Sequence, residues 1–206
     1  ASVFAGAMTA AREITKENPI YIRERLVNLK ILPYVTSKVV VLGVLSALQA
    51  LVFCAIILAR VKFPDLDVAL AGQIFILMYL VYLGGMAMGL LISSIVGNED
   101  KATGLVPLVV IPQMTLAGAI ITIDKTPEPG KFISNLAVSR WAFENFGAIV
   151  KMNDKIKVYV DQRPGLQNDF FDAFNGSIAL HYGILVGFIV TLLIATTLFV
   201  KRKDIR

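Results

Sequence analysis

Four long apolar runs divide the chain, and the stretches between them are polar. The runs occupy residues 35–59, 68–97, 105–123 and 177–200. A hydrocarbon core of about 30 Å is crossed by about 20 helical residues, because each residue adds 1.5 Å to a helix. Each run is therefore predicted to be a transmembrane helix, and the fold class is predicted to be an all-α membrane protein.

Two of the runs are expected to deviate from a straight perpendicular crossing. Residues 68–97 contain no charged side chain and are longer than one crossing needs, so we expect tilt, a kink near Gly84 and Gly85, or an end that projects from the bilayer. Residues 105–123 contain Pro107 and Pro112. Proline is tolerated in membrane helices where neighbouring groups satisfy the freed carbonyls, so this helix is expected to be bent and packed inside a bundle.

A charged segment, residues 12–38, precedes the first complete run. Residues 1–17 begin with small apolar side chains and carry no basic leader, and are interpreted as the end of a preceding helix. Asn18 followed by Pro19 is a helix start signal. Residues 18–32 are therefore predicted to form a short amphipathic helix that ends before Pro33, with one apolar face formed by Ile22, Leu26 and Leu29.

The basic residues predict an orientation. Residues 12–38 carry six Lys and Arg against three acidic residues, and residues 201–206 carry four against one. The long segment 124–176 carries seven of each. Because cytoplasmic loops carry the excess of Lys and Arg, both ends of the chain are predicted to be cytoplasmic and residues 124–176 to form an extracytoplasmic loop with short helices.

The composition and the candidate chemistry favour a membrane protein without a catalytic site in this chain. Apolar residues make up 56% of the 206 positions and charged residues 17%, and the net charge of +5 is explained by orientation, so no nucleic-acid partner is predicted. The chain has one cysteine, Cys54, and one histidine, His181, which is expected to be an interfacial polar residue. No catalytic, cofactor or metal site is predicted. No charged residue lies deep within a run, which argues against a proton relay.

Several uncharged residues within the runs are candidates for packing or for lining a path. Small residues recur every fourth position and allow close helix approach, either within the chain or at a subunit interface: Gly85, Gly89, Ser93 and Gly97. Gln49, Gln113 and Tyr79 are expected to form interhelical contacts or to line a cavity. Within the long loop, an apolar helical face including Phe143, Phe146 and Ile149 follows Trp141, which favours a half-buried helix at the membrane surface.

Three passages of the chain, in this order, resemble the type-2 ABC exporter permeases, especially the G-subfamily-like half-transporters. The charged segment 12–25 is followed by residues 33–38 at the opening of the first complete run. The other two passages are residues 94–120, which resemble the family's fourth-to-fifth-helix hairpin, and residues 138–144, which resemble the outer loop before its last helix. By this resemblance the chain is the C-terminal portion of a six-helix domain, from the end of its second helix onward.

The resemblance implies an ATP-driven exporter in the cell membrane that works as a homodimer or heterodimer. A nucleotide-binding domain, fused upstream or supplied as a separate chain, would bind ATP and Mg²⁺, and this chain would bind neither. The helix at 18–32 would be the coupling helix that docks on that domain, through polar contacts of Glu17, Arg23, Glu24 and Arg25. Ala119 and Ile120 match the position of the family's apolar outer gate.

Two alternatives stay open. The segment 12–38 could be a basic helix that anchors the protein to anionic lipid headgroups, although its three acidic residues favour a protein partner. The chain could also be a non-transporting anchor or assembly subunit whose outer loop binds a partner. A channel is a weaker alternative, because no run has a continuous polar face.

Overall fold

The computed structural model describes residues 1–26, 30–61, 63, 67–119, 127–161 and 174–203. These residues form α-helices and no strand, so the predicted all-α class is confirmed for the described part of the chain. The helices are α1 (Ser2–Ala10), α2 (Asn18–Leu26), α3 (Ile31–Arg60), α4 (Val68–Ile95), α5 (Glu99–Thr115), α6 (Glu128–Ser134), α7 (Val138–Ile149), α8 (Met152–Asp161) and α9 (Ile178–Lys203).

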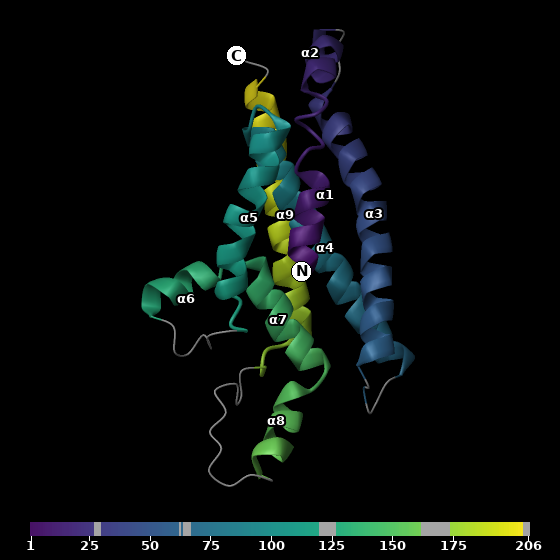
Figure 1. Cartoon of the computed structure of the whole chain (residues 1–206), viewed down its shortest axis with the longest axis vertical. Helices are drawn as coiled ribbons and strands as arrows, with labels where there is room; N and C mark the ends of the chain where they lie inside the picture. Colours follow the sequence, from purple (N-terminus) through teal and green to yellow (C-terminus); the bar gives the residue numbers. More distant parts are fainter. Residues whose placement is uncertain (27–29, 62, 64–66, 120–126, 162–173, 204–206) are drawn as a thin grey trace.

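Three helices in the described residues are long and apolar enough to cross a membrane. They are α3, α4 and α9, with 30, 28 and 26 residues. Figure 1 shows them running along the longest axis of the molecule. α3 begins at Ile31, before the predicted break at Pro33, because proline is tolerated in the first turn of a helix, where its missing N–H has no partner to lose.

The predicted span at 105–123 is not confirmed as one helix. α5 begins earlier, at Glu99, because the Asn98 side chain caps it by accepting a hydrogen bond from the amide of Lys101 at 2.8 Å. The helix contains Pro107 and Pro112 and ends at Thr115 after 17 residues. The chain then turns through Gly118, whose φ of 83° lies in the left-handed region. Residues 120–123 lie outside the described residues.

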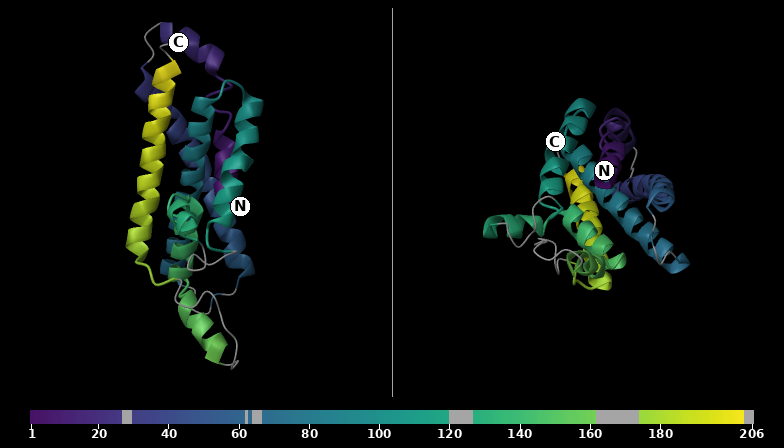
Figure 2. Two further views of the ribbon diagram at one scale, coloured as in Figure 1. Left: turned by 90° about the vertical axis from the view of Figure 1, so that its left-hand side faces the viewer. Right: turned by 60° about the horizontal axis from the view of Figure 1, so that its bottom comes forward.

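α4 is the central helix of the bundle. It packs against α1, α3, α5, α7 and α9, and in the right-hand view of Figure 2 α1, α3 and α9 lie beside it. Half of its residues are buried. A helix that is apolar on all sides is expected to be enclosed by other helices, and α4 has no charged residue along its length.

Small residues bring the backbones of α1 and α4 into contact. A Cβ added at Gly85 would overlap the carbonyl oxygen of Val3, and one added at Gly89 would overlap the carbonyl oxygen of Ala7. One turn further along, the Ser93 hydroxyl accepts hydrogen bonds from the amides of two residues in the turn after α1, at 3.0 and 3.1 Å. A Cβ at Gly97 would meet nothing within 4 Å. Gly85, Gly89 and Ser93 thus pack within the chain, as small residues do at close helix contacts.

α7 packs against the bundle with most of its residues half-buried, and its predicted place at the membrane surface stays a prediction. It packs against α4, α5 and α9, and none of its residues is exposed. Val138 lies against Gly84, where an added Cβ would be 3.1 Å from its Cγ1. Gly84 lies about 24 Å along α4 from Val68, given the rise of a helix. The apolar residues of α7 therefore contact α4, α5 and α9. The sequence pattern did not predict these contacts.

The two ends of the bundle differ. In Figure 1, α2 and the end of α9 lie at one end of the bundle, and α8 lies at the other, together with the end of α3. α6 projects sideways from the bundle in Figures 1 and 2.

Candidate coupling surface and polar contacts of the bundle

Four side chains join the turn after α1 to the beginning of α3. The Lys38 Nζ lies 2.5 Å from Glu17 Oε1 and 3.6 Å from Glu13 Oε2, and the Tyr34 hydroxyl donates to Glu17 Oε2 at 3.4 Å. We call these residues the Lys38 cluster. The Lys38 side chain is only 16% exposed and that of Glu17 30% exposed, so water screens this pair less than a fully exposed ion pair.

Of these four residues, only Glu17 was predicted as a site residue. Glu13 and Glu17 are four residues apart in the sequence, as are Tyr34 and Lys38. This spacing was the available signal, because it brings side chains to one side of a helical turn. The sequence did not show that the two pairs face each other, because the fold brings α3 back beside the turn.

Among its described side chains, α2 has a buried tyrosine and exposed charged residues. Its first turn begins at Asn18, and the Glu17 carbonyl accepts hydrogen bonds from the amides of Ile20 and Tyr21 at 2.9 and 2.8 Å. Tyr21 is 5% exposed, and its ring lies 4.9 Å from the ring of Tyr34 between centroids. Arg23 and Glu24 are exposed. The side chain of Arg25 lies outside the described residues.

The predicted cavity residues reach different neighbours. Gln49 on α3 donates from Nε2 to the Thr9 hydroxyl of α1 at 3.1 Å, whereas Gln113 on α5 donates to the Met88 sulfur of α4 at 3.2 Å. Tyr79 stacks on Phe75 with ring centroids 6.4 Å apart. Gln49 and Gln113 therefore contribute to separate contacts between helices, whereas the contact of Tyr79 with Phe75 lies within α4.

Gln49 also lines a groove of about 290 Å³ between α3 and α4, with apolar walls that include Phe53 and Tyr82. Its Oε1 is buried and has no hydrogen-bond partner among the described residues.

The predicted outer gate falls at the edge of the described structure. Ala119 is exposed and follows the turn at Gly118. Ile120 lies outside the described residues. The gate stays a prediction.

A polar network that the sequence analysis missed joins α7 to α9. Arg140 Nε donates to Glu144 Oε1 at 2.9 Å, and the other carboxylate oxygen lies 3.6 Å from His181 Nε2. Arg140 also donates to Ser134 at 2.9 Å. His181, expected at the membrane interface, is 3% exposed and packs on Trp141, with ring centroids 5.7 Å apart. The four-residue spacing of Arg140 and Glu144 was the signal in the sequence.

Among the described residues, no group of three or more His, Cys, Asp or Glu side chains could hold a metal ion. The polar groups above are used for contacts between helices. Arg23 and Glu24 of α2 are exposed, as are charged residues at the start of α5 and near the end of α9.

Comparison with known proteins gives two matches. Residues 2–150 match the model of a family described as ABC-2 type transporter. The chain is also 26% identical over 155 residues to the ABC transporter ATP-binding/permease protein Rv1747 of Mycobacterium tuberculosis. The match covers 73% of this chain and 18% of that protein, so the chain spans less than a fifth of its relative's length.

Proposed function

The chain belongs to the ABC-2 type transporter family as a membrane component, and we propose that it forms part of an export path coupled to a nucleotide-binding domain through α2. The observation that carries the proposal is that α2 has exposed charged residues while the residue before it, Glu17, contacts the bundle. Arg23 and Glu24 form the exposed surface. The Lys38 cluster joins the start of α2 to α3.

Two rigid connections would transmit a movement of α2. The first is the Lys38 cluster with the buried Tyr21, which leads to α3. The second is the pair of hydrogen bonds from the turn after α1 to Ser93, which leads to α4. Because α4 packs against most other helices, a displacement at its end would reach the whole bundle as a rigid-body movement.

The partner that moves α2 is proposed to be an ATPase. The name of the mycobacterial relative joins an ATP-binding part to a permease. In this chain's case the nucleotide-binding domain would be fused or separate, and it would hold ATP and Mg²⁺. Two permease chains, identical or different, would enclose the path. The α2 end of the bundle would face the cytoplasm, and α8 would lie on the opposite side.

Charge reversal on α2 tests the coupling. We would prepare Arg23→Glu and Glu24→Arg variants of the complete transporter, reconstitute them in lipid vesicles, and measure ATP hydrolysis with a panel of lipids and amphiphilic drugs. Stimulated hydrolysis is expected to fall while the amount of membrane-inserted protein stays the same. Lys157→Glu on α8 is the matched control, because Lys157 is also exposed and lies at the other end. Unchanged stimulation with both residues reversed together would refute the coupling surface.

A further inference from the structure

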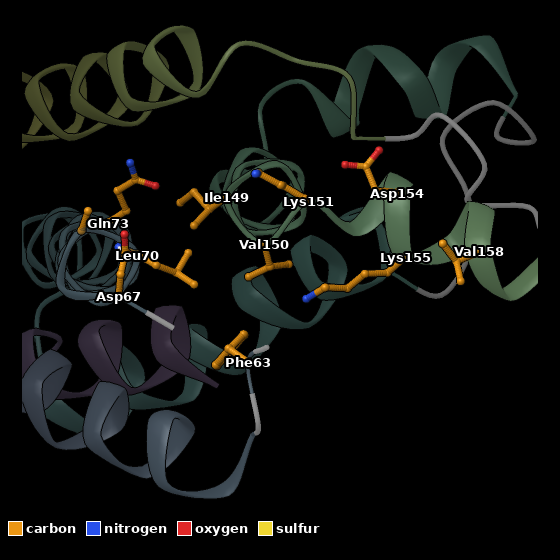
Figure 3. A pocket seen from close by; sticks show the side chains of 11 residues that line it. Phe63, Asp67, Leu70, Gln73, Ile149, Val150, Lys151, Asp154, Lys155 and Val158 are labelled. Carbon is orange, nitrogen blue, oxygen red and sulfur yellow. Dashed lines mark hydrogen bonds between the residues drawn. The ribbon is translucent and has the colours of Figure 1, made fainter. Parts of the chain in front are cut away.

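A pocket of about 750 Å³ lies at the end of the bundle opposite α2. It is formed by the first turns of α4, the junction of α7 and α8, and Phe63 from the connection between α3 and α4 (Figure 3). This volume is within the range of about 300–1,000 Å³ that is typical of small-molecule sites. None of its residues takes part in the contacts of the Lys38 cluster or in the network around Glu144.

The pocket has a firm apolar wall. Ile149 and Val150 are each 5% exposed and belong to the main hydrophobic core. Phe63 and Leu70 pack against the same core and complete the apolar surface. Because the core holds these side chains in place, the wall exists before a ligand arrives.

Two lysines bring positive charge to this wall. Figure 3 shows the side chains of Lys151 and Lys155 running from the α7–α8 junction toward the α4 side of the pocket. The Lys155 ammonium lies 5.8 Å from the centre of the Phe63 ring. Among the described residues, no carboxylate lies within 4.0 Å of either ammonium.

The two acidic residues of the pocket occupy helix starts. Asp67 caps α4, with its Oδ1 accepting from the Leu70 amide at 2.7 Å. Asp154 lies in the first turn of α8, where a carboxylate complements the partial positive charge of the helix start. Asp154 is exposed, but in Figure 3 its carboxylate points away from Phe63, whereas the two ammonium groups point toward the α4 side of the pocket.

The backbone of Lys151 sets the direction of the chain between α7 and α8. Its φ of 51° makes it the non-glycine residue with a positive φ in the described part of the chain. A side chain in the left-handed region costs roughly 1–2 kcal/mol. Lys151 directly follows the C-cap residue of α7, Val150, where helices commonly end with a residue in this conformation. Here it redirects the chain between α7 and α8 and places the Lys151 side chain at the pocket.

We propose that this pocket binds an anionic amphiphile. The phosphate or carboxylate head would contact Lys151 and Lys155, and the apolar tail would lie on Phe63, Leu70 and Val150. The pocket begins at Asp67, where α4 starts, and α4 is long and apolar enough to cross a membrane. At the surface of a membrane, the charged head of an amphiphile would therefore lie in polar surroundings and its tail in apolar ones. The proposal does not depend on coupling through α2.

The test is equilibrium binding of dodecyl phosphate to the complete transporter in nanodiscs of zwitterionic phosphatidylcholine. We expect saturable binding that Lys151→Gln and Lys155→Gln each weaken by about two- to fivefold, the range for a partly exposed charge contact. The double variant is expected to weaken it by about tenfold. Lys157→Gln on the same helix is the matched control, because Lys157 does not line the pocket.

A second variant tests the apolar part without changing charge. Ala69 lines the pocket and is exposed, so Ala69→Phe would fill the space without disturbing the core. It is expected to reduce dodecyl phosphate binding at least fivefold, with thermal stability unchanged. Equal binding of dodecyl trimethylammonium, or binding that the lysine and Ala69 variants leave unchanged, would overturn the proposal. Inorganic phosphate competing as well as dodecyl phosphate would also overturn it, because the tail would then contribute nothing.

The origin of the occupant is decided in the same assay. Nanodiscs containing phosphatidylglycerol would displace dodecyl phosphate if the natural occupant is an anionic lipid of the bilayer. Binding that persists in those nanodiscs, but retains its dependence on Lys151 and Lys155, would assign the pocket to an amphiphile from the aqueous side. Displacement and persistence both support a site for an anionic amphiphile. The Lys151, Lys155 and Ala69 variants are the measurements that can refute it.

Discussion

Lys38 and Glu17 form an ion pair of 2.5 Å that joins the beginning of α3 to the residue before α2. Glu13 approaches the same ammonium at 3.6 Å. One lysine thus holds two carboxylates, and the arrangement places α2 at a defined position at the end of the bundle.

Lys38→Met is expected to destabilise the protein by roughly 1–2 kcal/mol, between the values for exposed and buried pairs. The loss arises because Glu17 would lose its cation beside a second carboxylate, whereas Glu13 would keep its ion pair with Lys16 at 2.5 Å. Thermal unfolding in detergent measures it. Glu17→Gln combined with Lys38→Met is expected to recover part of the loss, since one of the two negative charges is then absent. A double variant less stable than the sum of the single variants would contradict the ion-pair account.

Gly85→Ala and Gly89→Ala are expected to separate α1 from α4. An added Cβ would overlap backbone carbonyl oxygens at both positions, and backbone atoms cannot move aside as a flexible side chain can. Such overpacking costs roughly 1–3 kcal/mol or more. Gly72→Ala is the matched control on the same helix, because its Cβ would meet nothing within 4 Å, and it should be neutral or slightly stabilising. Equal melting temperatures for Gly72→Ala and Gly85→Ala would refute the close packing.

Ser93→Ala is expected to leave two amides without their acceptor. The Ser93 hydroxyl receives both the Ile14 and Thr15 amides, and an unsatisfied buried donor costs about 1–3 kcal/mol. Amide hydrogen exchange at Ile14 and Thr15 should accelerate. Ser94→Ala is the control, because the Ser94 hydroxyl donates only to the Leu91 carbonyl of its own helix. Similar exchange rates in the two variants would contradict the role of Ser93.

Glu144→Gln is expected to loosen α7 from α9. The substitution removes the charge that pairs with Arg140 at 2.9 Å and that lies 3.6 Å from His181. Because both partners of the ion pair are about 15% exposed, a loss of about 1–3 kcal/mol is expected on thermal unfolding. Glu128→Gln provides the comparison: its side chain is 86% exposed beside Lys131, so its loss should be under about 1 kcal/mol.

The helices that the sequence predicted well are those whose signal is local. α3, α4 and α9 follow long apolar runs, and run length alone decides whether a helix can cross a membrane. α5 was predicted less well, because Asn98 extends its start and the turn at Gly118 follows its end, and neither feature changes the hydropathy of the run.

The candidate residues show the same limit. Glu17 could be singled out because it lies in a charged segment beside a helix start, but its partners Tyr34 and Lys38 lie 17 and 21 residues away. His181 was expected at an interface because a lone histidine at the mouth of a span has no local partner. Its contacts with Trp141 and Glu144 exist only because α7 returns to the bundle.

The sequence by itself determined that this is an all-helical membrane protein, because hydropathy and run length act over a single helix. Only the tertiary structure decided that α4 lies at the centre, that α7 packs against α4 and α9, and that Lys38 pairs with two carboxylates. It also decided that Lys151 and Lys155 border a pocket with Phe63. These features depend on which residues meet across helices, and the packing of side chains against distant neighbours settles that.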